Sequence, residues 1–252
     1  MLTIEEIITQ KPHLADPLRF YEKSVRFNDA VHGYVHPMQP VRNAYSPGSV
    51  EAIVHQFQNI FELPEGSLTP LQQALELGEI DFTRMPFLEV PAFSLPYPED
   101  DLTMLLFLLA RPYFRGLREQ NPRDGVAWKD GVCPVCKARP VIVSMASGNQ
   151  RQLLCSFCGT PGSADATGCA ICFSSDPAKL HHYTFEEEHG FTVHACDACR
   201  SYVKAIDNAL LGSATPDLAD LMSLPLDIVV QGKGYKRLAP NAVGMVRMSS
   251  NG

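Results

Sequence analysis

Two stretches of the chain decide its fold, CPVCKARPVIVSMASGNQRQLLCSFC at residues 133–158 and CAICFSSDPAKLHHYTFEEEHGFTVHACDAC at residues 169–199. Together they contain all eight cysteines of the 252-residue chain, as four Cys-x-x-Cys pairs. Such a turn aims two thiolates at one point, and two turns joined by an antiparallel hairpin supply the four ligands of a tetrahedral metal site. The sequence therefore predicts two consecutive metal-binding ribbons. The predicted ligands are Cys133, Cys136, Cys155 and Cys158 in the first ribbon and Cys169, Cys172, Cys196 and Cys199 in the second.

Disulfide bonds and thiol redox chemistry account for the cysteines less well than metal binding does. The N-terminus, MLTIEEIITQ at residues 1–10, lacks the basic start, apolar middle and cleavage site of a secretory signal. We therefore expect a cytoplasmic protein, in which thiols stay reduced and disulfides are rare. A thioredoxin-like redox motif would need one pair at the start of a helix, whereas this chain has four pairs in tandem. Sulfur-only tetrahedral sites suit zinc and rubredoxin-type iron alike, so we expect two ions of either metal per chain.

The pattern argues against a conventional enzyme. A site with four protein ligands is closed, and it has no open position at which a metal could activate water. No Ser/His/Asp or paired-carboxylate set stands out. The second ribbon also contains histidines, but eight cysteines already fill two sites, so we assign these to surface or strand positions. They are His181, His182, His189 and His194.

The charge of the chain argues against nucleic acid as a partner. The formal net charge is −7, and ionised thiolates would make it more negative even with two divalent ions bound. Between Gly131 and Arg200 there are five Lys or Arg against six Asp or Glu. A phosphate backbone needs a basic stripe instead. No run of 18 apolar residues occurs, so we expect no membrane insertion.

The remaining sequence predicts an α+β fold. Apolar residues at helical spacing predict helices near 14–25, 50–61, 69–78 and 101–117, the last with a break at Arg111-Pro112. Short β-like runs follow at 140–145, 152–154, 183–185 and 191–194, with hairpin turns at 147–149 and 189–190. Residues 202–210 are predicted to be helical, and Thr215-Pro216 and Leu224-Pro225 to open two short helices. The predicted units are a helical domain (1–125), a first ribbon (126–165), a second ribbon (166–212), and C-terminal helices with a tail (213–252).

The cysteine framework also carries a family resemblance. Its residues are Cys133-Pro134-Val135-Cys136, Leu154-Cys155-Ser156-Phe157-Cys158-Gly159-Thr160, Cys169 with Cys172, and Ala195-Cys196-Asp197-Ala198-Cys199-Arg200-Ser201-Tyr202-Val203-Lys204. Outside it, the resemblance rests on Lys11-Pro12-His13-Leu14 with Leu18-Arg19-Phe20-Tyr21, and on Asp217-Leu218-Ala219-Asp220, Leu224-Pro225-Leu226-Asp227 and Gly234-Tyr235. In these segments the chain resembles the formate dehydrogenase accessory protein FdhE family. One departure is visible, because the family commonly has a tryptophan shortly after the second cysteine pair. This chain has Pro161-Gly162-Ser163 there, and its only tryptophan is Trp128.

The resemblance implies a cytoplasmic maturation factor. Members of the family bind the catalytic subunit of a respiratory formate dehydrogenase before its export, are needed for its activity, and are associated with rubredoxin-type iron. By this likeness, the eight cysteines correspond to the family's metal ligands. Two alternatives stay open at this point, a rubredoxin-like electron-transfer or redox-sensing protein and, less favoured, a nucleic-acid-binding zinc ribbon. The oligomeric state is open as well, with a homodimer among the options.

Overall fold

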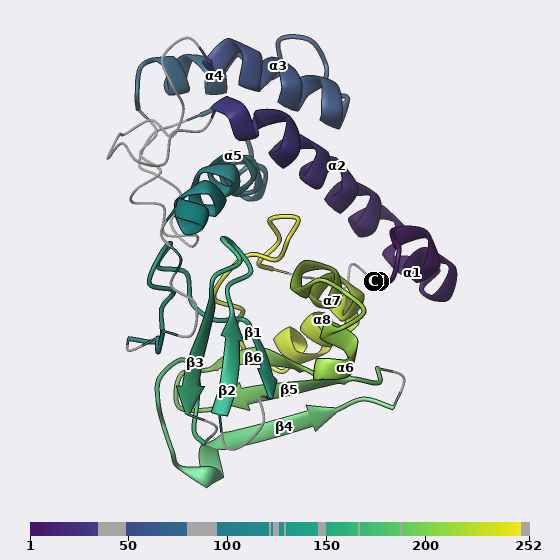
Figure 1. Ribbon diagram of the computed structural model, residues 1–252, viewed down its shortest axis with the longest axis vertical. Coiled ribbons are helices and arrows are strands. Elements are labelled where there is room, and N and C mark those ends of the chain that lie inside the picture. Colours follow the sequence, from purple (N-terminus) through teal and green to yellow (C-terminus); the bar gives the residue numbers. More distant parts are fainter. Residues whose placement is uncertain are drawn as a thin grey trace.

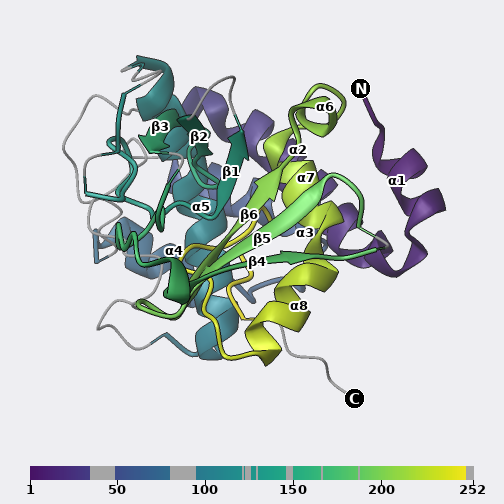
Figure 2. The ribbon, with the colours of Figure 1, turned by 90° about the horizontal axis from the view of Figure 1, so that it is seen from below.

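The computed structural model describes residues 1–34, 49–79, 95–120, 122, 126–128, 130–145, 150–165, 167–186 and 188–247. A bundle of helices from the first half of the chain lies over a mixed β-sheet, and helices from the C-terminal part lie between them (Figure 1). The predicted α+β class is therefore confirmed. From below, the strands of the sheet run across the molecule, with α8 beside them and α5 behind (Figure 2).

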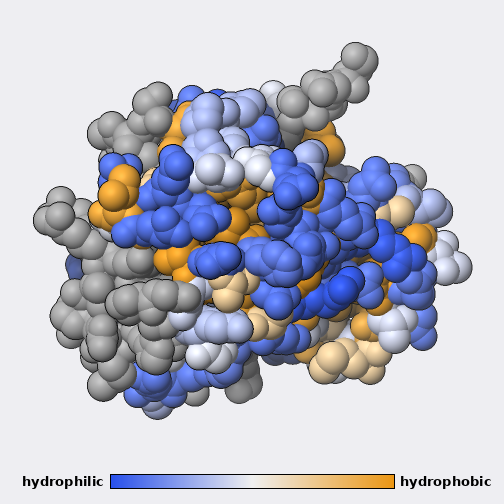
Figure 3. Space-filling model, turned by 90° about the horizontal axis from the view of Figure 1, so that it is seen from above, coloured by the Kyte–Doolittle hydropathy of each residue, from blue (hydrophilic) through white to orange (hydrophobic). Residues whose placement is uncertain are grey.

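The first half forms the predicted helices. They are α1 (Ile4–Gln10), α2 (Ala15–Val31), α3 (Val50–Phe61), α4 (Thr69–Glu76) and α5 (Glu99–Gln120), with short 3-10 turns at Pro12–Leu14 and His32–Tyr34. Phe27 of α2 packs edge-on against Phe57 of α3, with ring centroids 4.9 Å apart. The face seen from above, over α3 and α4, is mostly hydrophilic with narrower hydrophobic strips (Figure 3). Among the described residues, no helix has both the length and the apolar character needed to cross a membrane.

The break predicted at Arg111-Pro112 is wrong, because α5 continues through both residues. Proline removes one amide donor from a helix and crowds the preceding turn. Here the cost is offset by burial, since the residues from Leu105 to Phe114 are all buried. Tertiary packing thus overrides the local preference against proline.

The two ribbons join into a single sheet. Its strands are β1 (Ile142–Met145), β2 (Gln150–Leu154), β3 (Pro161–Asp165), β4 (Leu180–Thr184), β5 (Phe191–Cys196) and β6 (Ser201–Ile206), in the order β3-β2-β1-β6-β5-β4. All neighbours are antiparallel except β1 and β6, which pair in parallel with Ile142 opposite Lys204. The predicted turn at 189–190 lies between β4 and β5, whereas 147–149 lies outside the described residues. That the four predicted segments form separate units stays a prediction.

The helix predicted for residues 202–210 is wrong at its start. Residues 201–206 form β6, and only Asn208–Leu211 form a short helix, α6. All six residues of β6 are buried, because the strand lies between β1 and β5 and both of its faces are covered. A strand buried on both faces shows no period-two alternation, so its sequence cannot be distinguished from that of a buried helix.

The two short C-terminal helices form as predicted. They are α7 (Pro216–Met222) and α8 (Leu224–Gly232), and Thr215 caps α7 through its side chain. They pack against β6 through a fully buried ionic cluster that the sequence did not predict. Lys204 lies 2.6 Å from both Asp220 and Asp227, and Arg237 contacts the same two carboxylates at 2.6 and 3.2 Å. The cluster pairs two cations with two anions, so no buried charge is left uncompensated.

Trp128 packs on the strand that follows the second cysteine pair. The indole is 3% exposed, and the Trp128 amide donates to the Ser163 carbonyl of β3 at 3.2 Å. A Cβ atom added at Gly162 would lie 1.8 Å from Nε1 of the Trp128 ring. The tryptophan of this chain thus reaches β3 from an earlier segment, and Gly162 provides the space for it.

Gly162→Ala is expected to lower the free energy of unfolding by about 1–3 kcal/mol, because the indole must move out of contact with β3. The emission of the only tryptophan should shift to longer wavelength as its ring becomes exposed. Gly232→Ala is the matched control, since nothing lies within 4 Å of a Cβ atom there. Urea denaturation followed by fluorescence measures both effects. Unchanged stability and emission in Gly162→Ala would contradict this packing.

Candidate metal centres

The first four cysteines converge in the interior of the protein. Their Sγ atoms all lie within 4.8 Å of one another. Cys133 lies 3.5 Å from Cys158, and Cys136 lies 3.4 Å from Cys155, so each contact joins one turn to the other. None of the four residues is more than 4% exposed. We call this group the first centre.

The last four cysteines form a second group of the same shape nearer the surface. Their Sγ atoms also lie within 4.8 Å of one another, with Cys169 3.8 Å from Cys199 and Cys172 3.8 Å from Cys196. Cys196 is buried, Cys169 and Cys199 are half-buried, and Cys172 is exposed. We call this group the second centre.

The sulfur geometry fits a tetrahedral ion in each group. Four sulfurs bound at about 2.3 Å to one ion lie roughly 3.8 Å apart, whereas the two sulfurs of a disulfide lie about 2.05 Å apart. The sulfur contacts of 3.4–3.8 Å match the first arrangement, and all eight cysteines are free. Each group could therefore hold one ion. Zinc would supply folding energy, whereas iron would add one-electron redox chemistry.

All four Cys-x-x-Cys turns share one backbone conformation. The residue after the second cysteine has a positive φ in every turn, 64° at Lys137, 78° at Gly159, 61° at Phe173 and 53° at Arg200. In the first three turns its amide donates to the carbonyl of the first cysteine at 3.0 Å. This left-handed residue reverses the chain so that both thiols face the same side. Glycine adopts it freely, but the other three residues adopt it at a cost.

Substitutions at this position should have opposite signs in two turns of the same centre. Lys137→Gly is expected to stabilise the protein by about 1 kcal/mol, and Gly159→Ala to destabilise it by about 1 kcal/mol, because an L-residue is strained in this region. The Lys137 side chain is exposed and makes only a 3.4 Å hydrogen bond to Pro134, while a Cβ at Gly159 meets nothing within 4 Å. Denaturant unfolding of the two metal-loaded variants tests this. Shifts of equal sign would count against the strain argument.

A buried arginine of the helical half holds one turn of the first centre. Arg111 of α5 is 1% exposed, and it donates to the carbonyls of Ser156 and Phe157, each at 3.2 Å. It also donates to the Ala242 carbonyl at 3.1 Å and to Asp217 at 2.5 Å. The two residues between Cys155 and Cys158 are therefore fixed by a helix, a ribbon and the C-terminal segment together. The sequence did not point to this role, because a single arginine inside an apolar helix pattern has no distinctive spacing.

Burial makes the thiols of the first centre reluctant to ionise without a cation. Burial raises the pKa of the Cys136 and Cys155 thiols, and neighbouring thiols add to this at Cys136. The pKa of Cys133 is lowered by hydrogen bonds from Cys136, Cys155 and Cys158. All four thiols must lose their protons to bind a metal, so binding should release protons and weaken as the pH falls.

The histidines of the second ribbon lie outside both sulfur groups. Nε2 of His181 lies 2.8 Å from Asp197, and the rings of His182 and His194 stack with centroids 4.3 Å apart. Burial, with added repulsion from His182 and Arg151, lowers the pKa of His194 to about 4. His194 is therefore neutral at physiological pH. This placement agrees with the interpretation of these histidines as strand residues.

Comparison with known proteins gives the relationship of the chain. The family model described as the FdhE C-terminal domain matches residues 168–243. A Protein FdhE homolog from Rhizobium meliloti is 26% identical over 92% of this chain and 84% of that protein, and one from Aquifex aeolicus is 27% identical over 58% and 53%. The chain belongs to the FdhE family. Protein FdhE from Escherichia coli O127:H6 is 30% identical over 43% of this chain, spanning 36% of its own length.

The fold agrees with that of a solved FdhE structure. The crystal structure of the FdhE protein from Pseudomonas aeruginosa has a TM-score of 0.60 to this chain, covering 98% of this chain and 94% of that one at 19% identity. This likeness concerns the fold. The match to the Aquifex aeolicus homolog spans about half of that protein's length.

Proposed function

We propose that this FdhE-family chain is a cytoplasmic accessory protein, not an enzyme, which binds the catalytic subunit of a formate dehydrogenase and is needed for its activity. We further propose that its eight cysteines hold two metal ions, zinc or rubredoxin-type iron. The observation that carries the proposal is the pair of closed four-cysteine groups within an FdhE fold. Such centres supply rigidity, and they present no open coordination position for hydrolytic chemistry.

The arrangement of the molecule supports a binding role. The first centre is locked to the helical half through Arg111, so helices and ribbons form one continuous surface. The loops of the two centres also meet. A Cβ at Gly131 would lie 2.8 Å from the Ile171 carbonyl and 3.3 Å from the Phe173 ring. A client that contacts one ribbon would therefore also lie close to the other.

The test is to express the full chain with a tagged formate dehydrogenase catalytic subunit and to measure both co-purification and formate oxidation. We expect the wild-type chain to co-purify and to restore activity in a deletion strain, and Cys158→Ser to do neither. Glu65→Gln, at an exposed position of the helical half, should behave like wild type. Normal formate oxidation in the deletion strain, together with no co-purification, would defeat the proposal.

Electron transfer is the second candidate, and the exposure of Cys172 favours it, because an outer-sphere partner could approach that thiolate. It requires iron in the second centre. Anaerobically purified protein would then show ferric-thiolate absorption that bleaches reversibly on reduction. A colourless protein that contains only zinc would exclude this candidate and leave the accessory role intact.

A further inference from the structure

The two centres differ sharply in their access to solvent. Every cysteine of the first centre is at most 4% exposed, whereas Cys172 of the second centre is exposed. The next residue, Phe173, is 54% exposed and has a left-handed backbone, so the turn projects from the surface. A reagent, a chelator or a protein can reach the second centre without any part of the fold opening. The first centre can be reached only after local unfolding.

The first centre is also closed by direct contacts. The Thr160 hydroxyl lies 3.0 Å from the Cys158 sulfur. Phe157, between the cysteines of that turn, is fully buried with its ring 5.1 Å from those of Phe107 and Phe114. Release of an ion from this centre therefore requires separation of the ribbon from α5.

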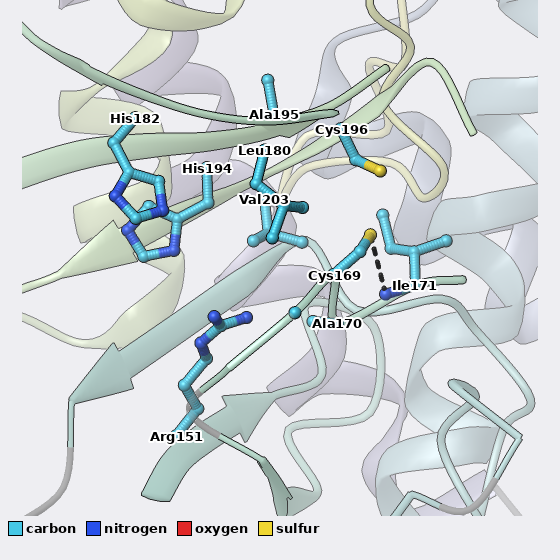
Figure 4. A pocket seen from close by; sticks show the side chains of 11 residues that line it. Arg151, Cys169, Ala170, Ile171, Leu180, His182, His194, Ala195, Cys196 and Val203 are labelled. Carbon is cyan, nitrogen blue, oxygen red and sulfur yellow. Dashed lines mark hydrogen bonds between the residues drawn. The ribbon is translucent and has the colours of Figure 1, made fainter. Parts of the chain in front are cut away.

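The second centre has a cation built in beside it, supplied by the other ribbon. Arg151 lies on β2, and its side chain lines a small cavity together with Cys169 and Cys196 (Figure 4). Arg151 is only 5% exposed, and its guanidinium points across the cavity toward the strands of the second ribbon (Figure 4). An arginine stays charged in proteins, so this cavity carries a permanent positive charge.

We propose that the two centres have different tasks: the first is a kinetically inert structural centre, and the second is the exchangeable and chemically accessible one, with Cys172 as its exposed ligand and Arg151 as its counter-charge. This inference rests on the proposed function, since it requires that both groups bind metal. Four thiolates around a divalent ion carry a net charge of about −2. A buried guanidinium stabilises that charge, so Arg151 strengthens metal binding at the second centre without contacting the ion.

The same electrostatics gives Arg151 a signature beyond stability. If the centre holds iron, the ferrous state is more negative than the ferric state by one charge. A nearby cation therefore favours the ferrous state and raises the reduction potential. Arg151→Met should lower that potential, whereas Arg151→Lys, which keeps the charge, should restore most of it. A role in packing alone would not distinguish methionine from lysine in this way.

The test uses the full chain loaded with Zn²⁺. Bound zinc is counted first, and then EDTA is added and the release of zinc is followed with time. We expect two ions per chain, released in two phases of equal amplitude. Iodoacetamide added with EDTA should alkylate Cys169, Cys172, Cys196 and Cys199 in the fast phase and the other four cysteines only in the slow one. Cys172→Ser should abolish the fast phase and leave the slow phase unchanged.

The arginine variants complete the test. Arg151→Met should accelerate the fast phase about 10- to 100-fold, the usual range for a group that supports metal ligands from outside the coordination sphere. Arg151→Lys should stay near wild type, and neither variant should change the slow phase. Release of both ions at one rate, earlier alkylation of the first centre, or equal effects of methionine and lysine would each overturn the inference. A chain that binds no zinc defeats it together with the proposed metal sites, whereas two ions released at one rate defeat the inference alone.

Discussion

Cys155→Ser is expected to leave the protein without a cooperative unfolding transition. Cys155 is 3% exposed in the first centre, next to the turn that Arg111 fixes to α5. Structural zinc sites contribute about 10–16 kcal/mol in small peptides. The net stability of a whole domain is only roughly 5–15 kcal/mol. Loss of one ligand at this position therefore removes energy comparable to the total.

The measurement is thermal unfolding of the variant, followed by circular dichroism and by Trp128 fluorescence, with metal content determined on the same sample. Cys172→Ser is the matched control, because it removes a ligand of the same type from the exposed second centre. That variant should lose one ion yet keep a cooperative transition at a lower temperature. If Cys155→Ser melted like wild type with two ions bound, the first centre would not be structural.

Lys204→Met is expected to cost about 3–5 kcal/mol, because it leaves a buried carboxylate without its cation. The Lys204 ammonium lies 2.6 Å from Asp220 and from Asp227, and all three residues are fully buried. Arg237 alone would then face two negative charges. Methionine fills nearly the same volume, so the loss reports the charge rather than a cavity.

A double variant separates charge balance from contact number. Lys204→Met combined with Asp220→Leu removes one charge of each sign and leaves Arg237 with Asp227. We expect it to be clearly more stable than the sum of the two single variants predicts, since charges within one network are not additive. Lys236→Met, at an exposed position of the same segment, should be near neutral. Urea unfolding of the four proteins measures this, and strict additivity would contradict the network.

The cysteine spacing predicts much of the structure because its information is local. A Cys-x-x-Cys turn needs only a few residues to set its shape, so the grouping of Cys133 with Cys158 and of Cys169 with Cys199 can be inferred from the chain alone. The structure brings these sulfurs together. That they bind metal stays a prediction. The first-half helices are equally accessible to prediction, since their apolar periodicity is clear.

The features that sequence patterns do not predict depend on distant neighbours. The apolar pattern of β6 favours a helix, and only its partners, β1 and β5, explain why all its residues are buried in a strand. The continuity of α5 through Pro112 depends on packing that a local rule does not include. Arg111 and Arg151 each reach across from one part of the fold to a centre in another. Their sequence surroundings contain no sign of this.

The parallel pairing of β1 with β6 constrains how the chain can be made and divided. During synthesis β1 emerges first and has no partner on that side until residues 201–206 follow. Pairings between segments so far apart in the chain form slowly. A fragment limited to residues 168–243, the span of the family model, would contain β6 but not β1. Its exposed strand edge would then recruit other chains. The smallest soluble piece of this protein should therefore begin before the first ribbon.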